Sequence, residues 1–471
     1  MLLAAAAVFI GSQLCRHCHA EVFDAYSRTP MARSSGRVEA VPAAQFTAAG
    51  HRYEIADRTL RFDGGSSTID YFIGSNAAGR TYLREREGYL FELPVTWYAQ
   101  KQAWDASPGY EKDSEVRLTR AVEPTCLQCH SSRVRPVLGT QNRYGDPPFL
   151  ENGVACERCH GPGSEHAQNP AKSPMVNPAK LDAERRDAVC IQCHLTGEAR
   201  IDRAGRKFSE YRAGDRLSDV ATYFVWKLGR RDLKVTSHVE KLAGSTCKTA
   251  AGDKLWCGTC HEPHTNADKT QQACVGCHTE AHRQQERCAT CHMPRTLAVD
   301  ANHGVMTDHS IPRTGKSVAA PAQKTLVPFL GTGDDRALGL AYAELGDRRA
   351  KEFLLRAAPQ DWPVRLRLAV LEPDAARAAQ LYESVLRENP YEPAALVNLG
   401  THLARLGRYT EAGQLWDRAL LTNPALEEAV LNLAQVRPPK DARALLLRYL
   451  EFNPVSRKAR EQLTKLASAH E

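Results

Sequence analysis

The stretch Cys257-Gly-Thr-Cys-His-Glu-Pro-His264 contains a five-residue motif, Cys-x-x-Cys-His, that decides the character of the whole chain. The motif occurs seven times in 471 residues and uses 14 of the 15 cysteines. We number the copies motif 1 to motif 7 in chain order. They span Cys15–His19, Cys126–His130, Cys156–His160, Cys190–His194, Cys257–His261, Cys274–His278 and Cys288–His292.

This spacing fits the covalent attachment of a haem. Two thiols three positions apart can each bond to one vinyl group of the same porphyrin, and the His that follows can donate a nitrogen to the iron. Zinc sites and thioredoxin-like redox pairs also use Cys-x-x-Cys, but neither explains a His directly after every pair. The sequence therefore predicts seven c-type haems.

The predicted haem-binding residues follow directly from the motifs. The thioether positions are Cys15, Cys18, Cys126, Cys129, Cys156, Cys159, Cys190, Cys193, Cys257, Cys260, Cys274, Cys277, Cys288 and Cys291. The proximal iron ligands are His19, His130, His160, His194, His261, His278 and His292. Cys247 is the one cysteine outside the motifs, and we expect it to be a small buried hydrophobic residue.

Composition agrees with a core built partly from haem. Aromatic residues make up only 7% of the chain and the mean hydropathy is −0.45, which is lean for a conventional core of this length. The polypeptide carries a net charge of +7. Each haem adds two propionates, so the oxidised holoprotein is expected to be near neutral, and we predict no nucleic-acid partner.

The first ten residues form a short apolar run that is too short to span a bilayer. It resembles the apolar part of a secretory signal. Haem is attached to such motifs outside the cytoplasmic membrane, and no later segment is apolar enough to cross one. We therefore expect a protein that does not span the membrane and is periplasmic or exported.

The chain between motif 1 and motif 2 alternates polar and apolar residues in several short stretches, which is typical of strands. Examples are residues 51–55, 68–73 and 89–98. These predict a small antiparallel β insert at about residues 45–110. Motifs 2 to 7 then follow one another closely between Cys126 and His292, so short helices and loops are expected there. Residues 11–313 are predicted to form one heptahaem cytochrome c domain.

The last part of the chain contains an internal repeat. The dipeptide Asn-Pro recurs at Asn389-Pro390, Asn423-Pro424 and Asn453-Pro454. A period of about 34 residues with a terminal Pro is typical of tetratricopeptide repeats, in which small residues such as Gly400 and Ala412 let two helices approach closely. We therefore predict a linker at 314–329 and an α-solenoid at 330–471, which makes the fold mainly α. Such repeats bind partners, so we expect a redox partner to dock there.

Histidines outside the motifs are candidates for the sixth iron ligand. The Gly161-Pro-Gly163 turn presents His166 close to motif 3, and His264 follows His261 too closely to bind the same iron. His264 is therefore suited to a neighbouring haem. His282, between motifs 6 and 7, is similarly placed, whereas His51 belongs to the strand-rich insert and is expected to be an ordinary surface histidine.

These features together resemble one family, the multihaem cytochromes c with C-terminal tetratricopeptide repeats that are related to the tetrahaem cytochrome of nitrifiers. The resemblance includes Tyr89-Leu-Phe-Glu-Leu-Pro-Val95, Trp104-Asp-Ala-Ser-Pro-Gly-Tyr110 and His303-Gly-Val-Met-Thr-Asp-His309. It implies the following distal ligands: His166, His238, His264, His282, His303 and His309.

Motif 1 departs from the pattern of the family it resembles. Relatives often carry a His shortly after this motif, where the present chain offers only Met31. The sequence therefore predicts either His19/Met31 ligation or no protein-derived sixth ligand at motif 1. A thioether ligand would raise the potential of that haem.

Electron transfer through the seven haems is the function that the sequence favours, with the repeats as a docking module. The alternative is an oxidoreductase that acts on a small nitrogen or sulfur compound at a five-coordinate haem. A Cys-x-x-Cys-Lys motif, which would mark such a haem, does not occur in the chain. A scaffold with purely structural haems is disfavoured by their number.

Overall fold

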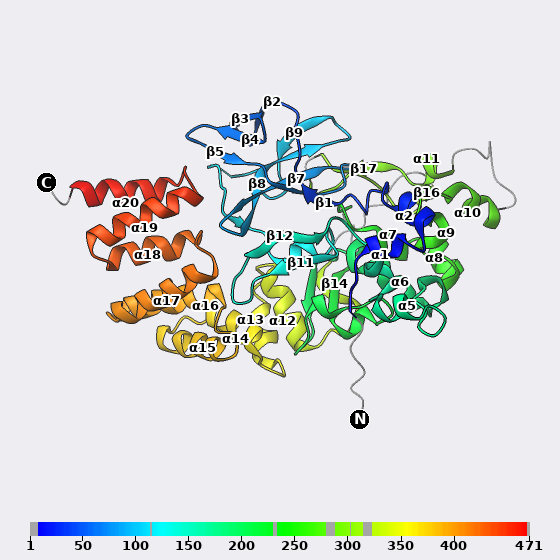
Figure 1. Cartoon of the computed structure of the whole chain (residues 1–471). Coiled ribbons are helices and arrows are strands. Elements are labelled where there is room, and N and C mark those ends of the chain that lie inside the picture. Colours follow the sequence, from blue (N-terminus) through cyan, green and yellow to red (C-terminus); the bar gives the residue numbers. More distant parts are fainter. Residues whose placement is uncertain are drawn as a thin grey trace.

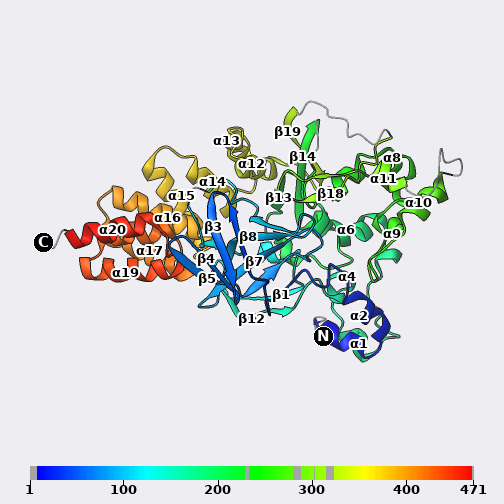
Figure 2. The same cartoon turned by 90° about the horizontal axis from the view of Figure 1, so that it is seen from above.

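The computed structural model describes residues 8–113, 115–228, 233–278, 288–301, 303–313 and 323–468. Figure 1 shows three parts: short helices that carry the haem motifs at one end, a β-rich part, and a stack of longer helices that leads to the C-terminus at the other end. A view from above, in Figure 2, shows the same separation of the motif helices from the C-terminal helices.

The β-rich part contains two antiparallel sheets. The first has the order β1-β6-β7-β8-β10, with β9 paired to β8, and the second has the order β2-β3-β4-β5. The first sheet consists of β1 (Ser35–Arg37), β6 (Tyr71–Ile73), β7 (Arg80–Arg86), β8 (Tyr89–Tyr98), β9 (Ala103–Ala106) and β10 (Arg120–Ala121). The second consists of β2 (Ala44–Ala48), β3 (His51–Ala56), β4 (Thr59–Phe62) and β5 (Gly65–Thr68). Strands thus extend beyond the predicted insert, residues 45–110, at both ends.

One predicted strand is divided between the two sheets. The sequence favoured a continuous strand at 68–73, but β5 ends at Thr68 and β6 begins at Tyr71. The carboxylate of Asp70 accepts hydrogen bonds from the Thr68 hydroxyl at 2.7 Å and from the Glu85 N–H at 2.8 Å. Ile69, with no exposed surface, fills the core at this bend. The chain crosses here from one sheet to the other, which alternation alone cannot reveal.

Each haem motif lies at a short helix or a helix end. The helices that contain motif residues are α1 (Ser12–Arg16), α3 (Pro124–Leu127), α4 (Cys156–His160), α6 (Ala183–His194), α9 (Cys257–Cys260), α10 (Thr270–Cys277) and α11 (Cys288–His292). One helical turn places residues i and i+3 on the same face, as two thiols on one porphyrin require. Helices this short are marginal alone, so tertiary contacts must hold them.

Further short elements connect the motif helices. The helices are α2 (Ala20–Tyr26), α5 (Ser164–Gln168), α7 (His238–Ala243) and α8 (Thr246–Ala251), and the two-stranded sheets are β11 (Arg133–Pro136) with β12 (Tyr144–Glu151), β15 (His261–Glu262) with β16 (Ala267–Asp268), and β17 (Arg295–Leu297) with β18 (Val305–Thr307). The expected mixture of short helices and loops is therefore found.

A three-stranded sheet joins the motif part to the C-terminal helices. Its order is β13-β14-β19, with β13 (Ala199–Asp202), β14 (Ala221–Leu228) and β19 (Gln323–Leu330). Strand β19 occupies the second half of the predicted linker, residues 314–329, whose first half lies outside the described residues. Pro328 is compatible with a strand because β19 is at the sheet edge. Leu326 is 4% exposed, so this segment is part of a core and does not act as a linker.

Nine helices follow β19 in the described part of the chain. They are α12 (Asp335–Glu344), α13 (Ala350–Arg356), α14 (Trp362–Val370), α15 (Ala375–Glu388), α16 (Pro393–Arg405), α17 (Tyr409–Thr422), α18 (Glu427–Val436), α19 (Pro439–Phe452) and α20 (Arg457–Ser468). The predicted repeat between Asn389-Pro390 and Asn423-Pro424 consists of α16 and α17. A Cβ atom at Gly400 would lie 2.6 Å from Nε1 of Trp416, so only glycine permits this helix contact.

The turns between these helices pack against the β-rich part. Tyr89 and Phe91 on β8 form a buried cluster with Ala425 and Phe452, in which the two Phe rings meet edge to face at 6.0 Å. Three ion pairs also join the C-terminal helices to the β-rich part: Arg86–Glu451, Arg448–Glu87 and Arg457–Glu115. Exposed pairs contribute little, so we attribute most of the stabilisation to the buried rings.

Candidate haem-binding site

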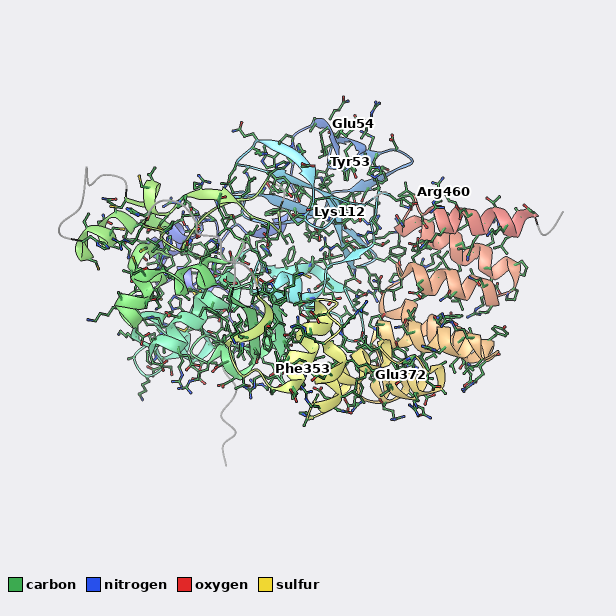
Figure 3. The ribbon with its side chains drawn as sticks, turned by 180° about the vertical axis from the view of Figure 1, so that it is seen from behind. Tyr53, Glu54, Lys112, Phe353, Glu372 and Arg460 are labelled. Atoms are coloured by element: carbon green, nitrogen blue, oxygen red, sulfur yellow. The ribbon has the colours of Figure 1, made fainter. Side chains whose placement is uncertain are left out.

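One large cavity of about 3590 Å³ runs through the motif part. All fourteen motif cysteines and all seven motif histidines line it, although the motifs are spread along the sequence from Cys15 to His292. Figure 3 labels Tyr53 and Glu54 on the β-rich part, and Phe353 and Glu372 among the C-terminal helices, all of them away from the motif helices. The residues that line the cavity run from Ile10 to Arg313 and include none from helices α12 to α20.

The cysteines are chemically free to bond to haem. All fifteen are described and none forms a disulfide. Cys247 also lines the cavity and is partly exposed, so the expected fully buried position is not observed. Apolar residues from many elements, among them Val22, Ile73, Val239 and Leu255, complete the lining. A large apolar space edged by paired thiols and imidazoles has the chemistry that c-type haems require.

Three pairs of histidines have the separation expected across one iron. The ring centres of His19 and His166 are 6.4 Å apart, those of His160 and His264 are 5.9 Å apart, and those of His261 and His309 are 6.3 Å apart. Two imidazoles bound to opposite sides of one metal ion, with nitrogen–metal bonds of about 2 Å, have ring centres roughly 6 Å apart. Each pair joins a motif histidine to a predicted distal ligand.

Hydrogen bonds fix the orientation of several of these rings. His160 Nδ1 bonds to the Val176 carbonyl at 2.7 Å, and His166 Nδ1 bonds to the Ser173 carbonyl at 3.0 Å. The same arrangement is found for His309, whose Nδ1 is 3.0 Å from the Thr307 carbonyl. A carbonyl partner on Nδ1 makes that nitrogen the protonated one and leaves Nε2 as the metal-binding atom.

A cluster of imidazoles connects motifs 4 and 5. The ring of His238 lies 5.2 Å from that of His194 and 4.8 Å from that of His309. Burial, with these neighbouring histidines, lowers the pKa of His238 to about 3. His238 is therefore neutral at pH 7, with a lone pair available for iron.

Motif 2 differs from these sites. Burial, together with nearby His194, lowers the pKa of His130 to about 4, which keeps it neutral as a ligand. None of the other described histidines faces it in the way that His166 faces His19.

In motif 7, His292 Nδ1 bonds to the Pro312 carbonyl at 3.0 Å, so its ring is oriented like that of His160. The predicted ligand His282 lies outside the described residues.

The motif 1 histidine, His19, lies opposite a histidine that the sequence did not assign to it. We expected His19/Met31 ligation or an open position, but the structure places His166 opposite His19. Met31 does line the cavity, and its carbonyl accepts the Val154 N–H at 2.9 Å, next to motif 3. The sequence missed this pair because His19 and His166 lie far apart along the chain.

Among the predicted ligands that the structure describes, only His303 is absent from the cavity lining. Its Nε2 contacts the Asp105 carboxylate, and its ring packs edge to face on Tyr98 at 5.2 Å. The neighbouring Val305 N–H bonds to Gln100 at 3.1 Å. These contacts hold the β17–β18 hairpin against the β8–β9 turn. His51 lies in β3 and is also absent from the cavity lining.

Two residues inside motif 3 have a positioning role that sequence reasoning missed. The Glu157 carboxylate is buried and accepts the N–H groups of Ile10 at 2.9 Å, Gly11 at 2.8 Å and Gly163 at 2.8 Å. Arg158 donates to the Gln128 carbonyl of motif 2 at 3.2 Å. The two variable positions of motif 3 thus tie it to motifs 1 and 2. No spacing rule marks them, because the motif leaves these positions free.

Comparison with known families gives two matches. Residues 96–161 match the model of cytochrome c554 and c-prime, and residues 369–436 match that of the tetratricopeptide repeat. The first covers motifs 2 and 3, and the second covers α15 to α18. No helix among the described residues is both long and apolar enough to span a bilayer.

Two curated relatives are similar to parts of the chain. The multihaem cytochrome MtrA of Shewanella baltica is 31% identical over 111 residues, which are 21% of this chain and 32% of MtrA. The c-type polyhaem cytochrome OmcC of Geobacter sulfurreducens is 32% identical over 75 residues, 15% of this chain and 9% of OmcC. The matched regions therefore span at most about a third of these relatives.

Solved structures resemble the chain only distantly. The outer cell wall cytochrome OcwA covers 88% of this chain and 99% of its own at 15% identity, with a TM-score of 0.41. A MamA mutant covers 29% of this chain and 86% of its own at 20% identity, with a TM-score of 0.26. These scores do not establish a shared fold. The family matches, the curated relatives and the seven motifs together indicate a multihaem c-type cytochrome with a tetratricopeptide-repeat segment.

Proposed function

We propose that this chain transfers electrons through seven covalently bound haems, as a periplasmic or exported protein. The observation that carries the proposal is the one cavity lined by every motif cysteine and every motif histidine. Bound haem iron would supply the one-electron chemistry. The polypeptide attaches the porphyrins, provides neutral imidazoles and keeps the sites next to one another.

Contacts between motifs support a continuous path. Glu157 ties motif 3 to the segment before motif 1, and the His160–His264 pair brings motif 3 to the chain just after motif 5. The Cys129 thiol lies 3.8 Å from the Gln192 carbonyl, between motifs 2 and 4. The Cys288 N–H donates to Gln271 on α10 at 3.1 Å, between motifs 7 and 6. The motifs are thus linked to one another at several points.

The proposed relation to the tetrahaem cytochrome of nitrifiers is supported by the match of residues 96–161. The sequence divides, in this proposal, into the heptahaem part at 11–313 and the repeat part at 330–471, with β19 joining them. The repeat part is proposed to hold the docking site for a redox protein partner.

Intact mass and rapid reduction test the proposal together. The purified holoprotein is expected to exceed its polypeptide by seven haem masses, and dithionite is expected to reduce every haem. Fewer than seven haems with free motif cysteines would contradict the count. Haems that dithionite cannot reduce, or that do not pass electrons on to an added acceptor, would contradict the relay.

A second candidate function is catalysis at motif 2 on a small nitrogen or sulfur compound. It is favoured by His130, because none of the other described histidines lies opposite its ring as His166 lies opposite that of His19. Glu92, whose pKa is raised by burial to about 7, lines the same cavity beside Arg120, 3.4 Å away. Electron paramagnetic resonance of the oxidised protein separates the two functions. A high-spin signal that is lost on adding such a compound supports catalysis, whereas an entirely low-spin spectrum supports the relay.

A further inference from the structure

Three exposed apolar side chains lie on neighbouring segments where the repeat helices join the motif part. Leu138, between β11 and β12, is 95% exposed, Leu421 at the end of α17 is 72% exposed, and Tyr391 is 60% exposed. We call these three residues the seam patch. A Cβ atom at Gly139 would lie 3.2 Å from the Tyr391 ring, and the Gln141 N–H donates to the Thr422 carbonyl at 3.0 Å. The β11–β12 turn and the repeat helices thus form one continuous surface.

Two arginines lie beside the seam patch. Arg418 donates to the Pro390 carbonyl at 3.0 Å, directly before Tyr391. The Arg143 guanidinium lies 5.6 Å from the Tyr89 ring centre, and the Tyr89 hydroxyl donates to the Leu421 carbonyl at 3.2 Å. Neither arginine pairs with a carboxylate in the part of the chain that the structure describes. The surface therefore has an apolar centre with two arginines at its edge that make no ion pair with a described carboxylate. The nearby Glu123 carboxylate accepts a hydrogen bond from Gln141, and burial raises the pKa of Glu392, which follows Tyr391.

Hydrogen bonds lead from the seam patch to motif 2. Asn423 donates to Gln141 Oε1 at 2.9 Å, and Gln141 Nε2 donates to the Glu123 carboxylate at 2.8 Å. Glu123 immediately precedes helix α3, and its carbonyl accepts the Cys126 N–H at 3.0 Å. Two side chains thus connect the repeat turn to the helix that attaches a haem.

We propose that the seam patch is the docking surface for an acidic redox protein that exchanges electrons at motif 2. The inference rests on the proposed electron transfer and adds the location and charge of the partner. An apolar centre with a polar rim is the usual make-up of a protein interface, and weak electron-transfer complexes bury little area. Arg143 and Arg418 would steer an acidic partner, and salt would weaken this attraction.

A defined probe tests the inference: reduced plant-type ferredoxin, an acidic iron–sulfur protein, mixed with the oxidised holoprotein in a stopped-flow experiment. The patch variant is Leu138→Asp with Leu421→Asp. The matched control is Leu297→Asp with Leu355→Asp, which are 54% and 59% exposed on β17 and α13. We expect the patch variant to lower the second-order rate at least tenfold and the control to stay within twofold. The wild-type rate is expected to fall as salt rises.

Several results would overturn the proposed docking surface, and each can be recognised separately. A patch variant that reacts at the wild-type rate, a control that slows equally, or a wild-type rate independent of salt overturns the docking surface. A wild-type dimer in light scattering that the patch variant abolishes would make the patch a self-association surface instead, and also overturns it. Dithionite reduction is measured in parallel, because its failure would contradict the proposed function rather than the docking site.

Discussion

The C-terminal helices and the motif helices bury apolar surface by different means. Between α16 and α17 the space is filled by the chain itself, since the Trp416 ring packs onto Gly400 and its Nε1 donates to the Val397 carbonyl at 3.1 Å. The motif helices instead surround a cavity of about 3590 Å³. Interiors are normally packed without large voids. The comparison indicates that the repeat part carries its own core, whereas the motif part depends on haem to complete one.

Preventing haem attachment is the strongest way to test this difference. When the protein is produced without haem-attachment machinery, we expect the motif part to lose its fold and the repeat helices to keep theirs. Hydrogen exchange, read peptide by peptide, should show fast exchange over α3 to α11 and protection over α14 to α19. The holoprotein is the control. Equal protection of both parts without haem would show that the motif part has a sufficient core of its own.

The contact between the repeat part and the β-rich part can be broken at Phe452. This ring is fully buried against Phe91 of β8. Phe452→Ala leaves a cavity and is expected to destabilise the protein by about 3–5 kcal/mol, as measured by denaturant unfolding. Leu447→Ala, on the same helix but 41% exposed, is the control and should change stability little. A small effect of Phe452→Ala would mean that the repeat part and the β-rich part are held together elsewhere.

Substitutions at two glycines test how closely the helices of the repeat part pack. A Cβ atom at Gly400 would collide with Trp416, and overpacking of this kind costs about 1–3 kcal/mol. The nearest atom to a Cβ at Gly413 is 3.6 Å away, so Gly413→Ala should be neutral or stabilise helix α17 by about 0.5–1 kcal/mol. The thermal unfolding temperature should therefore fall in Gly400→Ala and stay unchanged or rise in Gly413→Ala. A Gly400→Ala variant that unfolds at or above the wild-type temperature would contradict the close helix contact.

A substitution at motif 1 is expected to change stability least, but it should produce a specific spectroscopic change. His166→Ala should convert the low-spin signal of one haem into a high-spin signal in electron paramagnetic resonance, because His166 faces His19 at 6.4 Å. Met31→Ala is the matched comparison and should leave the spectrum unchanged. If Met31→Ala instead removes a long-wavelength charge-transfer band and lowers one haem potential, then thioether ligation at motif 1 is correct.

Local sequence determined the chemistry of the haem sites and the repeat. Attachment needs two thiols and an imidazole close together in the sequence, so it leaves a short-range pattern. A repeat with a period of about 34 residues reflects a pair of packed helices, and it is equally visible. The close contact between Gly400 and Trp416 is one example of such packing between the two helices of a repeat. The strands at 51–55 and 89–98 were also visible, because alternation reflects the pleat of the backbone.

Tertiary structure alone decided which groups meet. His166 reaches His19 from a distant part of the chain, while His303, which has the same residue type and a family resemblance in its favour, contacts Asp105 instead. Residues 323–330 look like a polar linker at their start but pair with β14 and bury Leu326. Glu157 occupies a position that the motif leaves open. In each case the partner is distant in sequence, so no local pattern records it, and the contact exists only once the whole chain has packed.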